Sequence, residues 1–212
     1  MTRIIIIRHG HSLSNGSGTL TGQLDSPLSE TGLKQADLIC KFIQDNYKVD
    51  AVYSSDLIRA VKTVEKIAGV FHTSVIPDKR FREIDCGAWQ GKPFDLLMQD
   101  SEYKFWNEHM GTTKTADGES FLDVQQRVLS AIEDISLKHE NQTVIIATHG
   151  GVIRTLQCHI AGENIENLTT IPWVPNASTT VVIKNGDKYD YELNGYCDYL
   201  GELITKLSST LK

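Results

Sequence analysis

The feature that most constrains the fold is a run of four isoleucines, Ile4–Ile7, that leads directly into Arg8-His9-Gly10. A short, uninterrupted β-branched run is typical of a strand that is buried on both faces, as in parallel α/β sheets. In such sheets ligands bind just beyond the carboxyl ends of the strands. The run therefore predicts a central strand whose end presents a cation, an imidazole and a flexible backbone to a ligand.

The same arrangement recurs at three other places along the chain. Arg59, Glu83 and His149 each follow a strand-like segment. These segments span residues 51–54, 75–77 and 143–148. Because the carboxyl ends of parallel strands meet at one edge of a sheet, we expect these side chains to lie together with Arg8 and His9.

Segments with helical periodicity separate the predicted strands, which indicates βαβ units and a largely parallel sheet. The clearest helix is expected over 29–47, with Ser29 as its cap. Its apolar residues recur at three- and four-residue spacing at Leu33, Ala36, Cys40, Ile43 and Tyr47. Further helices are expected from about Asp56, from Ser120 and over 151–161.

Two segments depart from this alternation. Asn185-Gly186 lies between strand-like runs at 179–184 and 188–193, which predicts an antiparallel hairpin near the end of the chain. Residues 86–119 are rich in aromatic and methionine side chains. This insertion is either a lid over the sheet edge or a small separate core beneath a long connection. The length of 212 residues predicts a single domain, 1–212, that contains the insertion.

Composition excludes several classes of function. A net charge of −6 argues against non-specific binding to nucleic acid or to an anionic membrane. The chain enters its first strand after three residues and has no long apolar segment, so we expect a cytoplasmic protein. The four cysteines have no paired spacing, which indicates buried apolar side chains rather than a zinc site or disulfides. The sequence carries no indication of an oligomeric state.

If the strand-end residues meet, they supply what phosphoryl transfer needs: cations around the phosphoryl oxygens, a nucleophile and a proton donor. Arg8 and Arg59 carry planar forks that bind phosphate in bidentate fashion. His9 would be the nucleophile, and the nearby arginines favour the neutral imidazole that this role requires. His149 would help to hold the bound phosphate. Glu83 would protonate the leaving oxygen and later accept a proton from water.

Each of these residues alone also has a structural interpretation. Glu83 could form a surface ion pair with Arg82, and Arg59 could be a solvated helix residue. The expected helix after His149 and Gly150 would in addition offer unpaired backbone N–H groups to an anion. It is the combination at four strand ends that favours catalysis over these separate interpretations.

These motifs resemble those of the histidine phosphatase superfamily, the phosphoglycerate mutase-like proteins, over nearly the whole chain. The matching segments are Arg8-His9-Gly10 with Asn15, Pro27-Leu28 with Gly32 and Gln35-Ala36, Ser54-Ser55-Asp56-Leu57 with Arg59-Ala60 and Thr63, Arg82-Glu83 with Gly87 and Trp89-Gln90-Gly91, Gly118-Glu119-Ser120 with Arg127, and Thr148-His149-Gly150-Gly151-Val152-Ile153-Arg154. The resemblance implies a three-layer α/β/α fold, a phosphorylated His9 and catalysis without metal or other cofactor.

The resemblance also marks positions around the phosphate site. Asn15 is expected to contact the phosphate, and Thr21 and Gln23 lie where relatives contact substrate through a loop. Many members carry an acidic residue after Arg-His-Gly, whereas this chain has His11. That side chain either contacts substrate or points into solvent, so it bears on the charge of the pocket and on its pH dependence.

The sequence therefore predicts a metal-independent phosphomonoester hydrolase that acts on a small phosphorylated metabolite through a phosphohistidine. One alternative is a bisphosphoglycerate-type phosphoglycerate mutase, but residues 83–126 carry three lysines, no arginine and nine acidic residues, which is a poor cradle for a second phosphate. A second is a metal-dependent hydrolase that uses His9 and His11 as ligands, although Arg8 would repel the metal. A third is a binding protein without turnover.

Overall fold

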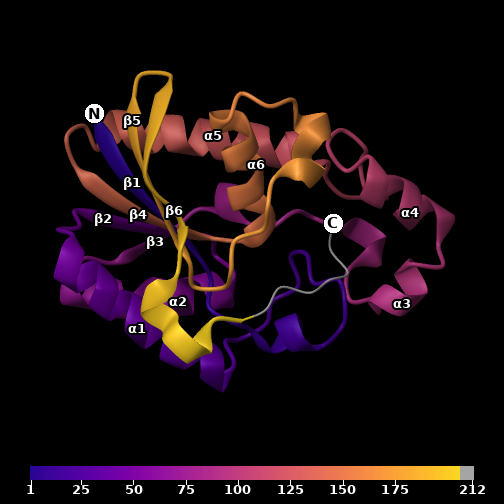
Figure 1. Ribbon diagram of the computed structural model, residues 1–212, viewed down its shortest axis with the longest axis horizontal. Coiled ribbons are helices and arrows are strands. Elements are labelled where there is room, and N and C mark those ends of the chain that lie inside the picture. Colours follow the sequence, from indigo (N-terminus) through magenta and orange to yellow (C-terminus); the bar gives the residue numbers. More distant parts are fainter. Residues whose placement is uncertain (206–212) are drawn as a thin grey trace.

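The computed structural model describes residues 1–205 as a sheet covered by helices on both faces (Figure 1). The strands are β1 Thr2–Arg8, β2 Ala51–Ser54, β3 Val75–Pro77, β4 Thr143–Thr148, β5 Thr179–Asn185 and β6 Lys188–Tyr196. The α-helices are α1 Glu30–Asn46, α2 Ile58–Val70, α3 Phe94–Leu97, α4 Ser101–Glu108, α5 Phe121–Lys138 and α6 Gly150–Ile160. Short 3₁₀ helices are η1 Leu13–Gly16, η2 Lys79–Phe81, η3 Gly87–Trp89, η4 Ile165–Thr170 and η5 Asp198–Leu203.

The strand order is β3-β2-β4-β1-β5-β6, and the first four strands in this order are mutually parallel. The strand β5 runs antiparallel to β1, and β6 runs antiparallel to β5. The predicted α/β fold with a mostly parallel central sheet is therefore confirmed. The isoleucine-rich strand β1 lies in the interior of the sheet, between β4 and β5, as expected for the apolar run Ile4–Ile7.

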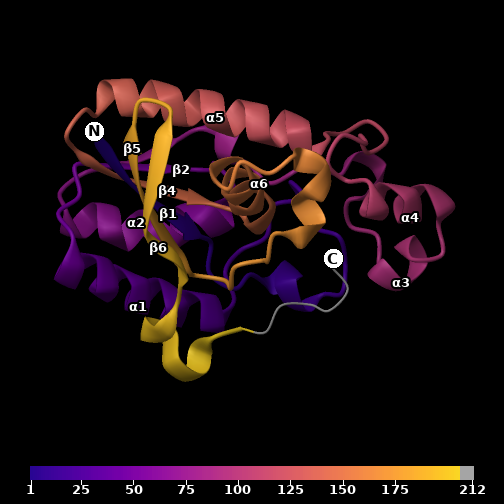
Figure 2. The same ribbon diagram turned by 45° about the horizontal axis from the view of Figure 1, so that its top comes forward.

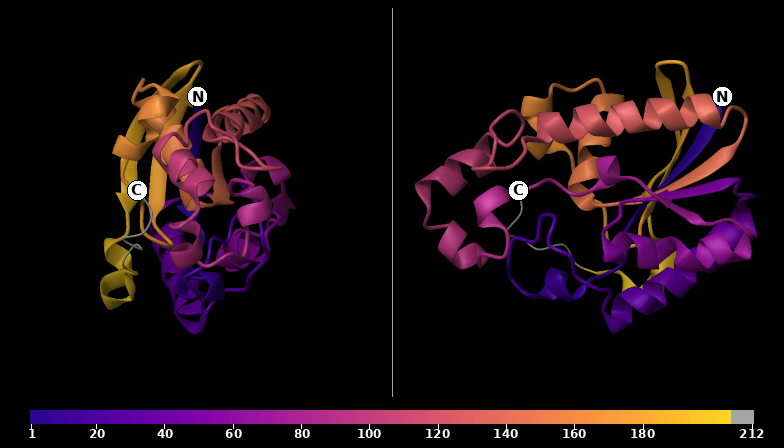
Figure 3. Two further views of the ribbon diagram at one scale, coloured as in Figure 1. Left: turned by 90° about the vertical axis from the view of Figure 1, so that its right-hand side faces the viewer. Right: turned by 180° about the vertical axis from the view of Figure 1, so that it is seen from behind.

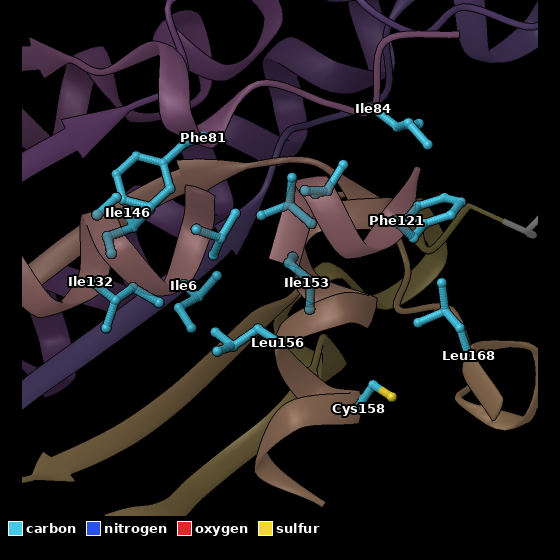
Figure 4. Packing of buried hydrophobic residues seen from close by; sticks show 14 of the residues in the cluster. Ile6, Phe81, Ile84, Phe121, Ile132, Ile146, Ile153, Leu156, Cys158 and Leu168 are labelled. Carbon is cyan, nitrogen blue, oxygen red and sulfur yellow. The ribbon is translucent and has the colours of Figure 1, made fainter. Parts of the chain in front are cut away.

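Successive isoleucines of β1 point to opposite faces and divide the core in two. Ile5 and Ile7 pack with apolar residues of α1 and α2. Ile4 and Ile6 belong to a larger cluster with α5 and α6, part of which is shown in Figure 4. Figure 2 shows the resulting layers, with α5 above the sheet and α1 below it. The three-layer arrangement thus follows from one strand that is buried on both faces.

The helices begin close to the expected positions, at residues that cap them. The Ser29 hydroxyl accepts a hydrogen bond from the amide of Gly32 at the start of α1. Ser120 and Asp123 form the reciprocal capping box expected for α5. The helix expected from about Asp56 begins two residues later, at Ile58, and that expected over 151–161 spans 150–160.

Two expectations about local structure are wrong. Ala36, Cys40 and Ile43 of α1 are buried as expected, but Leu33 is 54 % exposed, because the first turns of the helix bury Gly32 and Gln35 instead. The hairpin turn was expected at Asn185-Gly186, but Asn185 pairs with Lys188 within the ladder. The two-residue turn is therefore Gly186-Asp187, and Gly186 takes the positive φ that such a turn requires.

The insertion at 86–119 forms α3 and α4, which project from one end of the sheet (Figure 3). Its buried side chains are continuous with the α5–α6 core, since Trp106 stacks on Phe121 at 6.1 Å between ring centroids. It is therefore not a separate core. Two other side chains of the insertion, Met98 and Phe105, are exposed. None of the helices that the structure describes is long and apolar enough to cross a lipid bilayer.

Gly32 offers a direct test of how α1 is docked beneath the β1 end. A Cβ at this position would lie 2.0 Å from the backbone oxygen of His11, so the glycine allows the helix to approach that loop. We expect Gly32→Ala to lower the free energy of unfolding by about 1–3 kcal/mol. Gly69→Ala in α2 is the matched control, because an added Cβ there meets nothing within 4 Å.

Urea unfolding of both variants measures the difference. The control should be unchanged or more stable by about 0.5–1 kcal/mol, the usual gain for alanine over glycine in a helix. Equal stability of the two variants would show that the approach of α1 to His11 is not constrained as described.

Candidate active site

The sheet brings the predicted histidines together. Arg8 and Thr148 are register partners at the ends of the neighbouring strands β1 and β4, so His9 and His149 emerge side by side. Their ring centroids are 5.1 Å apart, and both side chains are buried. The two imidazoles therefore lie at one edge of the sheet, where open α/β sheets bind ligands.

His9 is held in one tautomer. Its Nδ1 lies 2.7 Å from the backbone oxygen of Gly10, which can only accept, so Nδ1 carries the proton and Nε2 keeps a free lone pair. Burial first, and then the charges of Arg59 and Arg8, hold the pKa of His9 well below 6.5. The imidazole is therefore neutral and nucleophilic at neutral pH.

His149 is fixed in the opposite tautomer. Its Nδ1 accepts a hydrogen bond from Arg59 Nε at 3.3 Å, so the proton lies on Nε2, which donates to Ser55 Oγ at 2.8 Å. Burial, followed by the charges of Arg59 and His9, keeps the pKa of His149 well below its usual value. Without bound anion both imidazoles are thus uncharged.

Arg8 is buried with an incompletely satisfied guanidinium. Its NH1 group donates to the backbone oxygen of Val174 at 2.5 Å, whereas its Nε is buried without a hydrogen-bond partner. Burial lowers the pKa of Arg8 to about 10, partly opposed by the charge of Glu83. The side chain remains a cation at neutral pH and retains donor capacity for an anion.

Arg59 extends from the first turn of α2 and is 2 % exposed. One terminal nitrogen donates to the backbone oxygen of Leu24 at 2.8 Å and the other to that of Gly22 at 2.9 Å. Burial lowers its pKa, and Glu83 acts in the opposite direction. Each terminal nitrogen carries a second hydrogen, so Arg59 can hold the 22–24 loop and still bind phosphate oxygens.

Glu83 lies in the same pocket and accepts two backbone hydrogen bonds. The amide of Gly151 donates to Oε2 at 3.1 Å, and that of Ile84 donates to Oε1 at 3.0 Å. The alternative of a surface ion pair with Arg82 is wrong, because Arg82 pairs with Asp56 at 2.6 Å. The carboxyl group is therefore oriented by the helix start that follows His149.

The remaining predicted positions divide into pocket and support residues. Asn15, Thr21 and His11 line the pocket. Gln23 does not; its amide donates to the backbone oxygen of Glu83 at 3.0 Å and thus supports the acid-bearing segment. Gly150 does not line the pocket either, and lies where a Cβ would meet the Trp173 ring at 3.0 Å and the Arg8 guanidinium at 3.3 Å.

His11 does not point freely into solvent. Its Nδ1 lies 2.9 Å from the hydroxyl of Ser29, the same residue that caps α1, and its ring lines the pocket. Burial and the neighbouring Arg8 lower the pKa of His11. The side chain of His11 is thus neutral at neutral pH and adds no charge beside Arg8 and His9.

The pocket itself encloses about 180 Å³ and lies between the strand ends and the insertion. One part of it is lined by Arg8, His9, His11, Arg59 and Glu83, whereas His149 lies behind this surface and is not among the lining residues. Its outer part is mainly apolar and is lined by Leu20, Ile84, Phe94, Trp106, Met110 and Phe121. Within residues 1–205 no group of three or more His, Cys, Asp and Glu side chains is placed to hold a metal ion.

Sequence reasoning missed several residues of the site. Ser55 directly follows β2, so the strand-end argument that found His149 could have found it as well. Val174 and Asn176 precede β5, and the Asn176 amide donates to the backbone oxygen of His9 at 3.1 Å. Only the antiparallel pairing of β5 with β1 brings this segment to the site, and no local sequence signal indicates that neighbour.

Comparison with known proteins agrees with the family resemblance of the sequence motifs. A model of the histidine phosphatase superfamily, branch 1, matches residues 4–195. A metal-independent phosphoserine phosphatase from Arabidopsis thaliana is 35 % identical over 189 residues, which cover 82 % of this chain and 79 % of that protein. The phosphoglycerate mutase-like protein 4 of the same plant is 29 % identical over 206 residues, which cover 94 % and 87 %.

Among solved structures, YhfR from Bacillus stearothermophilus superposes with a TM-score of 0.88 at 30 % identity. The match covers 94 % of this chain and all of that one. The arrangement of strands and helices described above is therefore shared with a whole protein of known structure.

The two buried neutral imidazoles predict a dependence of stability on pH. In the unfolded chain His9 and His149 take up protons near pH 6.5, whereas in the folded protein their depressed pKa values prevent it. The unfolded state then binds more protons, so the free energy of unfolding falls as the pH is lowered below about 6.5. Each such group contributes a slope of up to about 1.4 kcal/mol per pH unit.

Urea unfolding between pH 7.5 and 5.5, on the wild type and on His149→Gln, measures this slope. In the variant this slope should be smaller by up to about 1.4 kcal/mol per pH unit, the contribution of one protonated group. Carboxylates and His11 contribute equally to both proteins, so the comparison isolates position 149. An unchanged slope in the variant would mean that His149 is not held neutral in the folded state.

Proposed function

The chain belongs to branch 1 of the histidine phosphatase superfamily and is a phosphatase, and we propose that it hydrolyses small phosphomonoesters through a phosphohistidine at His9, without a metal ion. The observation that carries this proposal is the state of His9. Its neutral ring donates Nδ1–H to the backbone oxygen of Gly10 and keeps Nε2 unprotonated, in a pocket that Arg8 and Arg59 also line. A nucleophile and its phosphate-binding cations are thereby preformed.

In the first step Nε2 of His9 attacks phosphorus, and the bond between phosphorus and the ester oxygen breaks. Arg8 and Arg59 hold the phosphoryl oxygens, and His149 gains a proton or a stronger hydrogen bond once the dianion is bound. Glu83, in its carboxylic acid form, donates its proton to the leaving oxygen. The alcohol departs, and a phosphorylated His9 remains.

In the second step water attacks the phosphorus of phosphohistidine, and the phosphorus–nitrogen bond breaks. The carboxylate of Glu83 takes the proton of that water, which restores its acid form for the next turnover. The products are inorganic phosphate and neutral His9. In this scheme residues 1–212 act as one phosphoglycerate mutase-like domain in which 86–119 covers the pocket.

The mutase alternative has less support. A mutase must hold a second anionic group of its substrate, and among the described residues that line the pocket Arg8 and Arg59 are the cations. Both already face the phosphoryl site. The phosphoserine phosphatase named above makes phosphoserine a first substrate to try, with other small phosphorylated metabolites beside it.

The cysteines are all free thiols, which supports a reducing compartment such as the cytoplasm. They are Cys40, Cys86, Cys158 and Cys197.

We expect His9→Ala to abolish turnover, because the variant loses the unprotonated imidazole nitrogen that the proposed attack on phosphorus requires. Glu83→Gln should slow phosphate release by a factor of about 10²–10⁴, the usual contribution of a general acid, and should leave binding of inorganic phosphate nearly intact. His159→Ala, at an exposed position of α6, is the control and should retain full activity.

Rapid mixing with substrate, followed by an alkaline quench, should trap a phosphorylated enzyme, because phosphohistidine is labile to acid. Peptide mapping by mass spectrometry then identifies the modified residue. Equal, mild losses in both active-site variants, or a phosphorylated residue other than His9, would contradict the proposed roles.

We further expect activity to persist in a chelator. Steady-state phosphate release from phosphoserine and phenyl phosphate should have the same kcat/KM in excess EDTA as in buffer, since the cations that bind phosphate are guanidinium groups. The metal-dependent alternative predicts the reverse: loss of activity that returns when a divalent metal is added.

A further inference from the structure

The outer part of the pocket carries one polar group that the proposed reaction does not use. Asn107 lies on α4, is 5 % exposed and lines the pocket. Its Oδ1 is buried and has no hydrogen-bond partner among the described residues. Buried side-chain amides almost always have partners, so an unpaired one on a pocket wall needs an explanation.

The surroundings of Asn107 make that explanation specific. Its helix neighbours Tyr103 and Trp106 are buried aromatic residues, and Met110 follows within one turn. An apolar side chain at position 107 would fit such a wall without leaving polar atoms unpaired. The indole Nε1 of Trp106 is likewise buried without a partner. The Tyr103 hydroxyl is a third such group, so three side chains of α4 carry a buried polar atom without a partner among the described residues, and Trp106 and Asn107 line the pocket.

The contacts also place this wall relative to the reacting atoms. The Phe121 ring lies 2.8 Å from a Cβ built on Gly151, whose amide binds the Glu83 carboxylate. Phe121 also stacks on Trp106, which precedes Asn107 on α4. Glu83, Phe121, Trp106 and Asn107 all line one pocket. A substrate whose phosphate reaches His9 can therefore extend its leaving group over these rings toward Asn107.

We propose that Asn107 is a specificity-determining residue that binds a neutral polar group, such as an amide or a hydroxyl, on a leaving group with an apolar body. This proposal rests on the phosphatase reaction proposed above and names its substrate class. The carboxamide offers both a donor and an acceptor, which match a neutral amide or hydroxyl. The apolar body packs on Phe121, Trp106 and Met110.

Charge distinguishes this class from acidic substrates. Among the described residues that line the pocket, the cations are Arg8 and Arg59, and both face the phosphoryl site. A carboxylate on the leaving group would therefore enter an apolar wall without a described counter-ion. Leaving groups with a neutral polar group should be preferred over the same body that carries a carboxylate.

The test compares phenyl phosphate with its 3-carbamoyl and 4-carbamoyl derivatives and with 4-carboxyphenyl phosphate. For the wild type, at least one carbamoyl ester should have a kcat/KM about tenfold above that of phenyl phosphate beyond the intrinsic reactivity of the phenol. Asn107→Leu should remove this preference, because it removes the polar partner and keeps the volume. Comparing this substrate ratio between the wild type and the variant cancels the intrinsic leaving-group effect, which is the same in both enzymes.

Gln99→Leu is the matched control, since it removes an amide from an exposed position of the same insertion. It should keep the wild-type ratio. Asn107→Ala provides a second variant if Asn107→Leu packs poorly, and thermal unfolding shows whether each is folded. A carbamoyl preference that is absent from the wild type, or that survives in both Asn107 variants, would overturn the proposal.

The failure of this inference is distinguishable from a failure of the proposed reaction. If phenyl phosphate is hydrolysed through His9 and the substrate ratio does not depend on Asn107, the reaction stands and the subsite does not. If phenyl phosphate is not hydrolysed and no phosphohistidine forms, the proposed reaction itself is wrong, and the leaving-group subsite is wrong with it.

Discussion

The burial of two guanidinium groups against two imidazoles is the constraint on which the site depends. Burial first, and then the charges of Arg8 and Arg59, keep the imidazoles of His9 and His149 neutral. The backbone carbonyls of Gly22, Leu24 and Val174 accept hydrogen bonds from the two arginines. These carbonyls come from loops far apart in the sequence. The positive charge of the site is thereby fixed before any anion arrives, which is the preorganisation that phosphoryl transfer needs.

The fold serves this cluster through a single strand. Because β1 is buried on both faces, helices must cover both sides of the sheet, and the only open direction for the residues that follow it is the carboxyl edge. The neighbouring strands β2 and β4 end at the same edge and bring Ser55 and His149 to His9. The geometry of the two histidines is therefore a consequence of strand register rather than of the loops alone.

Sequence patterns were sufficient for the parts of the site that follow strands. The β-branched runs, the capping serines and the residues at strand ends located β1, β2, β4, α1 and α5, and placed His9, Arg59, Glu83 and His149 at one edge. Patterns failed where position depends on a distant neighbour. The Arg8 contact with Val174 requires the pairing of β5 with β1, and Gln23 supports Glu83 because two loops meet in space. The exposed Leu33 shows the same limit, since helical spacing located the buried stripe of α1 but not the residues at its edge.

The position of Arg59 links recognition of the two halves of a substrate. Its terminal nitrogens hold the carbonyls of Gly22 and Leu24, and Thr21, which precedes them, lines the pocket. A bound phosphate that attracts the Arg59 guanidinium must therefore change the hydrogen bonds between Arg59 and this loop. If a bound leaving group repositions the loop and changes the affinity for phosphate by some factor, thermodynamic reciprocity requires that bound phosphate changes the affinity for that leaving group by the same factor. We thus expect the affinities for inorganic phosphate and for the free alcohol product to be coupled through the side chain of Arg59.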